Sequence, residues 1–249
     1  MLRLTKTEDQ SSSGQKRATP APLDQKFFEK WDSFVEAHPL GSIYHLSGWK
    51  EVIEESFKHI KGDIIAIWDK DSHEIIAGLP VYYVDSIITG KRYVSAPFAN
   101  FCEPLTSHPE ETKILFDYLV GVYDRKRPSY IEVRARPDNR FATPNFVTST
   151  HYLHHFLPLD ASPEMLFKKF HKKAVRVPIL KAANNNLLLK PAEIEDDVLQ
   201  FYQIYFKARK NLGLPSIPYK FFQKLWEVFY PSRRMQLILC AFDHNVIGA

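Results

Sequence analysis

The stretch RYVSAPFANFCEPL (residues 92–105), together with YIEVRARP (residues 130–137), decides the fold that this sequence predicts. A strand ends at Ser95-Ala96-Pro97, and a loop rich in aromatic and amide groups, a helix and a second strand follow. On the second strand, alternation separates two sets of side chains. One face carries Tyr130, Glu132, Arg134 and Arg136, and the other carries Ile131, Val133 and Ala135. The charged face is either a salt-bridged side of a sheet or the floor of a cleft.

The chain around this stretch predicts helices and a hairpin. Asp24 caps a helix with apolar residues at helical spacing, and Ser47 caps a second one. The runs DIIAIWD and EIIAGLPVYYV around the turn KDSH predict a β-hairpin. Residues 109–123 predict a helix, and YIEVRA and FVTSTHYLHHFLPL predict strands. Residues 1–23 are polar and predict a disordered tail, so we expect the first domain over residues 24–159.

A second domain is expected over residues 160–249. Helices start near residues 162, 195 and 218, while LLLKP and MQLILCAFD are strand-like. A returning strand, VIGA, ends the sequence and leaves an open apolar edge. We therefore expect this domain to be incomplete and the chain to self-associate through that edge. Both domains combine helices with strands, which is an α/β (α+β) organisation in tandem.

Composition limits the class of protein. The 249 residues carry a net charge of +4 and 45% hydrophobic residues, as in an ordinary soluble globular protein. No apolar run is long enough to span a bilayer, and Cys102 and Cys240 form no disulfide or metal pattern, so we expect a cytoplasmic location. His151, His154 and His155 scatter over both faces of a strand-like run, so no metal site is expected.

Six motifs occur in an order and spacing that resemble the Fem-type (FemAB-related) aminoacyltransferase branch of the GNAT superfamily. They are GSIYHLSGWKEVIEESF (41–57), IAGLPVYYV (76–84), GKRYVSAPFANFCEPL (90–105), YIEVRARP (130–137), the basic helix 172–181 and FYQIYFKARKNLGLPSIPYKFF (201–222). The resemblance implies two GNAT-like domains with mixed, largely antiparallel sheets flanked by helices. It also implies a chain that normally continues beyond residue 249, which again makes the second domain incomplete.

The same resemblance implies an enzyme that transfers an acyl or aminoacyl group to an amine of a cell-envelope precursor, of peptidoglycan or exopolysaccharide. The donor is either aminoacyl-tRNA or acyl-CoA, and no other cofactor is implied. Pro178 interrupts the basic helix, and the residues present lack the Gly-rich turn that holds pyrophosphate in acyl-CoA-binding relatives. Two alternatives stay open: an acyl-CoA-dependent N-acetyltransferase acting on a sugar or peptide amine, and an inactive GNAT-like binding module of a polysaccharide-synthesis system.

Acyl transfer to an amine needs a proton acceptor, donors for the oxyanion and positioning groups. The hypothesised catalytic residues are Glu132 and Tyr205. The hypothesised substrate-binding residues are Ser95, Asn100, Arg134, Arg136, Lys172, Lys173, Arg176 and Arg209. The arginines suit a phosphate or carboxylate, and the basic helix suits a diphosphate or a tRNA backbone. The charged residues and Tyr205 each have a structural alternative, namely an ion pair or surface charge, a stacked surface pair or a solvated helix face. For Phe98 and Phe101 the choice is between a pocket wall and the core.

Overall fold

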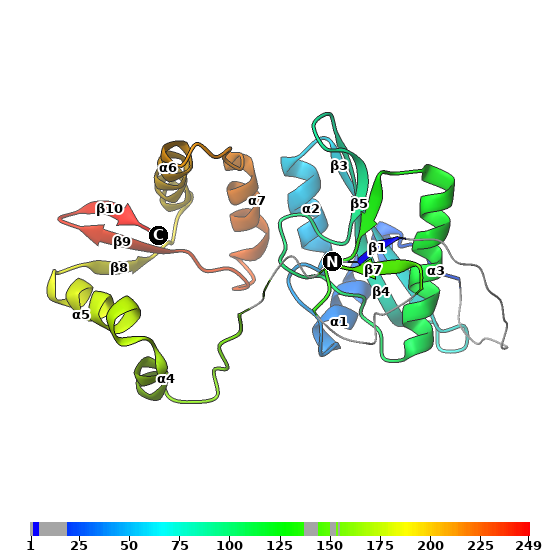
Figure 1. Cartoon of the computed structure of the whole chain (residues 1–249), viewed down its shortest axis with the longest axis horizontal. Coiled ribbons are helices and arrows are strands. Elements are labelled where there is room, and N and C mark those ends of the chain that lie inside the picture. Colours follow the sequence, from blue (N-terminus) through cyan, green and yellow to red (C-terminus); the bar gives the residue numbers. More distant parts are fainter. Residues whose placement is uncertain (1, 5–18, 137–143, 150–152, 154) are drawn as a thin grey trace. The chain divides into compact units, whose positions relative to one another are not determined.

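The computed structural model describes residues 2–4, 19–136, 144–149, 153 and 155–249. The chain divides into two compact units, Met1–Tyr152 and Leu153–Ala249, which are described separately (Figure 1). In the described part of the chain, no helix is both long enough and apolar enough to cross a membrane. His151 and His154 lie outside the described residues.

The first unit is built on a five-stranded sheet in the order β2-β3-β4-β5-β6. Its strands are β2 (Ala21–Pro22), β3 (Ile60–Trp68), β4 (Ile75–Ser86), β5 (Gly90–Val94) and β6 (Tyr130–Glu132). All neighbours are antiparallel except β5 and β6, which are parallel. A parallel pair needs a crossover connection, and helix α3 (Pro109–Lys126) provides it. The predicted hairpin and the strand–helix–strand order are both confirmed.

Helices cover both faces of this sheet. The 3₁₀ turn η1 (Gln25–Phe27) leads into α1 (Phe28–Ala37), and α2 (Ser47–Ser56) follows. Asp24 accepts from the backbone of Lys26 as predicted, whereas the Ser47 hydroxyl donates to Asp32 at 2.6 Å instead of capping α2. The hydroxyl takes this partner because Ser47 is already the first helical residue.

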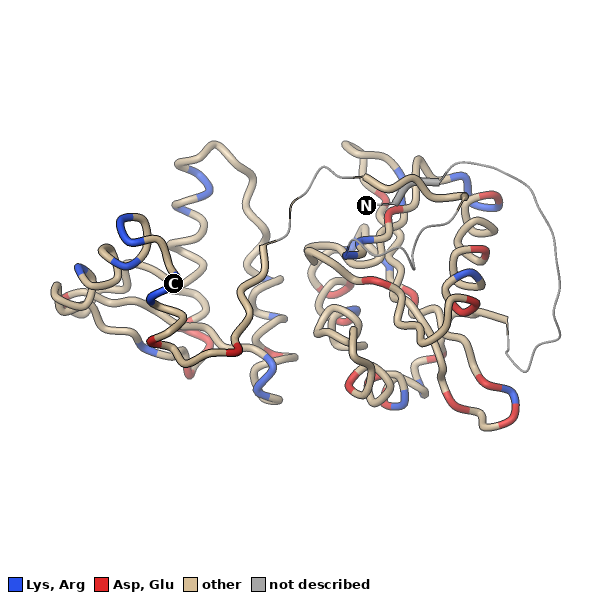
Figure 2. The backbone as a smooth tube through the Cα atoms, turned by 60° about the horizontal axis from the view of Figure 1, so that its bottom comes forward, with Lys and Arg blue, Asp and Glu red and all other residues tan. Residues whose placement is uncertain are grey.

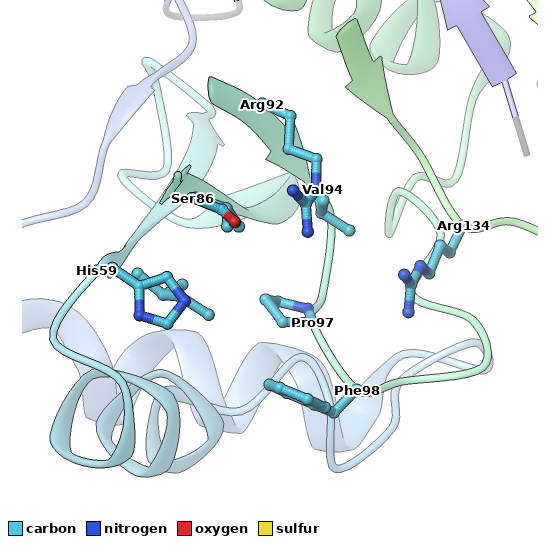
Figure 3. Close-up of a pocket in the computed structure, with 9 residues that line it drawn as sticks. His59, Ser86, Arg92, Val94, Pro97, Phe98 and Arg134 are labelled. Carbon is cyan, nitrogen blue, oxygen red and sulfur yellow. The ribbon is translucent and has the colours of Figure 1, made fainter. Parts of the chain in front are cut away.

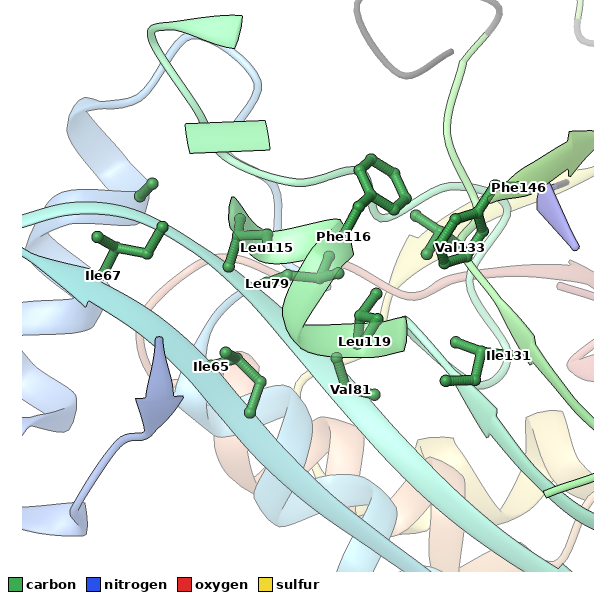
Figure 4. Close-up of a cluster of buried hydrophobic side chains, with 11 residues drawn as sticks. Ile65, Ile67, Leu79, Val81, Leu115, Phe116, Leu119, Ile131, Val133 and Phe146 are labelled. Carbon is green, nitrogen blue, oxygen red and sulfur yellow. The ribbon is translucent and has the colours of Figure 1, made fainter. Parts of the chain in front are cut away.

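One core cluster of the unit lies between the sheet and α3. Leu115, Phe116 and Leu119 of α3 pack against sheet residues, and Ile131 and Val133 join them from β6 and its continuation (Figure 4). The sheet residues in this cluster are Ile65, Ile67, Ala77, Leu79 and Val81. The alternation predicted from YIEVRA is therefore confirmed, because its apolar residues face α3 and leave Glu132 on the opposite side.

Two segments differ from their predictions. The predicted disordered tail contains β1 (Leu2–Leu4), which pairs with β7 (Phe146–Thr148), and β2, which pairs with β3. Residues 5–18 lie outside the described part. The backbone of these short stretches gains hydrogen-bonding partners on strand edges, which composition does not reveal. The long strand expected over residues 146–159 is confirmed only at β7, since Leu153 and residues 155–159 are not in a strand.

The second unit pairs a three-stranded antiparallel sheet, in the order β10-β9-β8, with helices (Figure 1). The strands are β8 (Leu188–Pro191), β9 (Ile238–Phe242) and β10 (Asn245–Gly248). The helices are α4 (Pro163–Lys169), the π turn η3 (Lys172–Arg176), α5 (Val177–Asn184), α6 (Glu195–Asn211) and α7 (Tyr219–Phe229). The predicted break in the basic helix takes the form of this π turn, which runs directly into α5, and Pro178 in the first turn of α5 has no backbone N–H to donate to the preceding turn.

Candidate functional site: a cationic pocket in the first unit

A pocket of about 330 Å³ opens at one end of the five-stranded sheet (Figure 3). Its lining residues are His59, Ile60, Val84, Ser86, Arg92, Val94, Pro97, Phe98 and Arg134. They come from the start of β3, the end of β4, β5, the loop after β5 and the chain beyond β6. The size suits a small ligand or one end of a longer substrate.

Strand register explains why these residues meet. Val84 of β4 pairs with Ile60 of β3 on one side and with Arg92 of β5 on the other. Directly opposed residues project to the same face, so these three side chains line one wall. On β6, Tyr130 pairs with Arg92, and Glu132 pairs with Val94. The chain then continues from Glu132 to Arg134.

The pocket is cationic. It is lined by two guanidinium groups and one imidazole, and none of its lining residues is acidic. The guanidinium groups of Arg92 and Arg134 both extend toward the space between them (Figure 3). Arg92 Nη1 donates to Oγ1 of Thr89, which ties it to the neighbouring turn. Two guanidinium groups with a hydroxyl nearby, that of Ser86, form a suitable site for a phosphate or a carboxylate.

Phe98 forms the apolar wall. Its ring stacks on that of Phe57, with centroids 4.8 Å apart and an interplanar angle of 19°. The backbone of Phe98 has a φ of 61°, which an aromatic L-residue adopts at a cost of about 1–3 kcal/mol. The fold maintains this conformation at the rim of a pocket, where strained residues are often functional. Of the two readings for Phe98, the pocket wall is the one that the geometry supports.

Arg134 is held rigidly by its neighbours. Its Nε donates to Oε1 of Glu132 at 2.7 Å, and its Nη1 donates to the carbonyl of Ala99 at 2.6 Å. Its backbone N–H donates to Oγ of Ser95 at 3.0 Å. Glu132 and Ser95 are buried, and neither lines the pocket. The structure thus places both residues behind Arg134 rather than in direct reach of a ligand.

Arg136 belongs to a different cluster. It donates from Nε to Oε1 of Glu103 at 2.5 Å, and its guanidinium lies 5.1 Å from the ring centroid of Phe101. Glu103 is buried. Asn100 is exposed on the same loop and does not line the pocket. Neither Arg136 nor Asn100 therefore lines the pocket.

A buried histidine, His45, bonds to the backbone of this loop. His45 is fully buried and contacts the carbonyl oxygen of Glu103 through Nε2 at 2.9 Å and Ser42 Oγ through Nδ1 at 2.8 Å. Because burial disfavours the imidazolium, the pKa of His45 falls to about 4. Burial also raises the pKa of the Cys102 thiol well above its usual value, so this cysteine is not a ready nucleophile.

The remaining predicted site residues lie in the second unit. Tyr205 accepts a hydrogen bond from the backbone N–H of Ile217 at 3.1 Å, and Arg209 donates to the carbonyl of Pro215 from Nε and Nη2. Both side chains are therefore hydrogen-bonded to the backbone of the connection between α6 and α7. Lys172 and Lys173 are exposed on η3, and Arg176 is half-buried there.

Comparisons with known proteins support the fold but give no sequence match. No protein-family model matches the sequence, and no curated protein sequence matches it. A crystal structure of FemX matches in three dimensions, with a TM-score of 0.57 and 14% sequence identity. The chain is similar in fold to FemX. The match covers 85% of this chain and 56% of the FemX chain, so this chain spans little more than half the length of FemX. The expected fold class, a mixed and largely antiparallel sheet flanked by helices as in the GNAT-like Fem fold, is confirmed.

Sequence reasoning missed three of the polar residues that line the pocket, namely His59, Ser86 and Arg92. A signal for them existed in the hairpin register. With the turn at residues 69–74, β4 residues near 84–86 must return beside the start of β3, and the tight turn at Gly90 brings Arg92 beside them. Figure 3 shows His59, Ser86 and Arg92 around one space, although His59 precedes Arg92 by 33 positions in the sequence.

Proposed function

We propose that this protein is an N-acyltransferase of the Fem type, which transfers an acyl or aminoacyl group to an amine of a cell-envelope precursor. The observation that carries this proposal is the FemX-like fold over 85% of the chain. The cationic pocket adds support, since precursors of this class carry phosphate and carboxylate groups. The motif resemblance to the Fem group points the same way.

In the proposed reaction, the amine nitrogen of the acceptor attacks the carbonyl carbon of an ester or thioester donor. A C–N bond forms, the bond from carbonyl carbon to the donor oxygen or sulfur breaks, and the nitrogen loses a proton as the leaving group gains one. The donor is aminoacyl-tRNA or, as a rival, acyl-CoA. We assign the pocket to the anionic part of the acceptor, because Arg92 and Arg134 can each form charge-assisted hydrogen bonds with it.

We further propose that Glu132 acts as a positioning residue. Its Oε1 accepts from Arg134 Nε, so the carboxylate fixes the direction of the guanidinium that lines the pocket. This differs from the role of proton acceptor that the sequence suggested. Tyr205 and Arg209 are proposed to order the α6–α7 connection, since each is bonded to its backbone.

The test combines binding with turnover. Thermal unfolding of the whole chain is followed with a UDP-linked peptidoglycan precursor, an aminoacyl-tRNA and an acyl-CoA, each added separately. A ligand present at 100 times its dissociation constant stabilises the fold by about 2.7 kcal/mol. Arg92→Gln should abolish the shift caused by the precursor, whereas Lys91→Gln, an equal loss of charge at the exposed neighbouring residue, should leave it. Transfer of a labelled amino acid from tRNA to the precursor then completes the assignment.

A binding module is the second candidate, and one observation favours it. The two polar groups predicted to be catalytic, the Glu132 carboxylate and the Tyr205 hydroxyl, are both occupied by structural hydrogen bonds. Precursor binding that Arg92→Gln removes, with no transfer from either donor, would establish the module. If no anionic ligand shifts the unfolding midpoint, both proposals fail.

A further inference from the structure

The segment Pro163–Asn184, here called the basic segment, is ordered without being buried. It contains α4, η3 and α5, and none of these three helices has a buried residue. Side-chain caps fix it instead: Ser162 Oγ accepts from the backbone of Met165, and His171 Nδ1 accepts from that of Ala174 at 3.0 Å. A segment that is helical and capped but has no buried residue presents a surface for a partner.

The basic segment carries a large excess of positive charge. It contains six Lys or Arg residues and a single acidic residue, Glu164 (blue and red in Figure 2). The six are Lys168, Lys169, Lys172, Lys173, Arg176 and Lys181. Within the described part of the chain, none of these cations forms an ion pair, whereas Lys50 pairs with Glu54 and Lys113 with Asp117 in the first unit. The basic segment is therefore available to a polyanion.

Aliphatic side chains are exposed among these cations. Met165 is 56% exposed, Val177 48%, Ile179 47% and Leu180 55%. The next strand, β8, adds exposed Leu188 and Leu189, and Figure 1 shows α5 on the β8 side of the sheet. Cations mixed with half-exposed aliphatic groups match an anionic bilayer interface, where the charges meet phosphates and the apolar groups enter the acyl boundary.

We propose that the basic segment docks this protein on an anionic phospholipid surface. Nucleic acid is the other common polyanion, but single strands stack their bases on aromatic rings and duplex backbones are bound by cations, so neither uses exposed aliphatic groups beside the cations. The two aromatic residues here, Phe167 and Phe170, are half-buried, and the exposed apolar groups are aliphatic. This inference depends on the surface alone and stands whether or not the transferase proposal holds.

Vesicle binding of the whole chain tests the proposal. Cosedimentation is measured with vesicles of phosphatidylcholine alone and with vesicles containing phosphatidylglycerol. Binding should require the anionic lipid, and Lys172→Gln/Lys173→Gln should weaken it about fivefold for each lysine removed. The matched control, Lys207→Gln/Lys210→Gln, removes two exposed lysines from α6 in the same unit and should bind as the native chain does.

A second variant separates insertion from simple charge attraction. Leu180→Ser should weaken binding to anionic vesicles, most visibly at high salt, where electrostatic attraction is screened. A tryptophan placed by Ile179→Trp should show blue-shifted emission on those vesicles and quenching by brominated acyl chains. Because Leu180 and Ile179 are half-exposed, neither change should alter the unfolding midpoint.

Three results would overturn the proposal. They are no binding to anionic vesicles, equal binding to neutral vesicles, and binding in which Leu180→Ser matches the native chain while a short RNA displaces the vesicles. The last result would assign the segment to nucleic acid. Each outcome is independent of the precursor-binding assay, so failure here leaves the proposed transferase function intact, and the reverse also holds.

Discussion

Arg134, which lines the pocket, forms an ion pair with the buried Glu132 behind it, with Nε and Oε1 2.7 Å apart. The Glu132 side chain is 10% exposed and the Arg134 side chain 30%, so the carboxylate is the buried partner. A pair in which one member is buried and the other borders a ligand site links the stability of the fold to the geometry of the site.

Glu132→Gln should reduce the free energy of unfolding by about 1–2 kcal/mol, because the ion pair is replaced by a weaker hydrogen bond from the charged guanidinium to a neutral amide. It should also weaken precursor binding, since Arg134 loses its fixed direction. Urea denaturation measures the first effect, with Glu51→Gln on the exposed face of α2 as the control. If Glu132→Gln and Glu51→Gln have the same stability, the pair contributes nothing to the fold. A double-mutant cycle with Arg134→Gln then isolates the coupling.

Gly78→Ala should destabilise the first unit by about 1–3 kcal/mol. A Cβ atom at Gly78 would lie 2.5 Å from the Trp31 ring and 2.7 Å from the carbonyl oxygen of Ile65. The backbone cannot move away easily, because the N–H and carbonyl of Gly78 both bond to Leu105.

Gly121→Ala is the matched control for that change. There a Cβ would meet only the guanidinium end of Arg125, which can rotate away. Because Gly121 lies within α3, alanine should stabilise the protein by about 0.5–1 kcal/mol. Thermal unfolding of both variants gives the comparison, and a stable Gly78→Ala variant would refute the close packing of α1 on the sheet.

The pH dependence of stability should contain a contribution from His45. Its pKa in the folded state is about 4, below the unfolded value of about 6.5, because it is buried. The unfolded chain therefore binds more protons between these values. Stability from this residue is complete above pH 6.5 and declines as pH falls toward 4, by roughly 3 kcal/mol in all. Urea unfolding of native and His45→Gln chains from pH 7 to 4.5 should show a shallower decline in the variant. Equal slopes would mean that His45 titrates normally.

Tyr205→Phe should loosen the α6–α7 connection without disrupting the helices. It removes the hydroxyl that accepts from the Ile217 N–H, a loss of about 0.5–1.5 kcal/mol. Hydrogen exchange at the Ile217 amide should quicken by about tenfold. Tyr202→Phe, one turn earlier on α6, removes a hydroxyl with no hydrogen-bond partner among the described residues and should leave that exchange rate unchanged. Equal exchange in both variants would contradict the assigned role of Tyr205.

Local pattern was sufficient for most elements of the fold. The alternation in YIEVRA correctly assigned Ile131 and Val133 to the core, and the periodicity of residues 109–123 located α3. Short strands were harder, because β1 and β7 depend on pairing between residues 2–4 and 146–148, and no local pattern reports a partner so distant in sequence.

The candidate site was only partly predictable for the same reason. Arg134 was identified because a charged residue on a buried strand is costly and thus conspicuous. Arg92 was not singled out, because its place at the pocket depends on register with Val84 and Tyr130. Glu132 was given a chemical role on type and position alone, whereas its geometry depends on the neighbouring Arg134 side chain.

The parallel pairing of β5 with β6 has a consequence for engineering this protein. Both strands end on the same side of the sheet, so Phe98 and Arg134 are supplied by chain that has already left the paired strands. Ser86 and Arg92, in contrast, lie inside the antiparallel ladder. Substitutions in the loop at residues 97–101 can therefore reshape the Phe98 wall of the pocket without shifting any strand, as long as the Ala99 carbonyl that holds Arg134 keeps its position. The sheet fixes the positions of Ser86 and Arg92, whereas the loop that carries Phe98 can be varied. Libraries of variants aimed at new ligands should therefore randomise this loop.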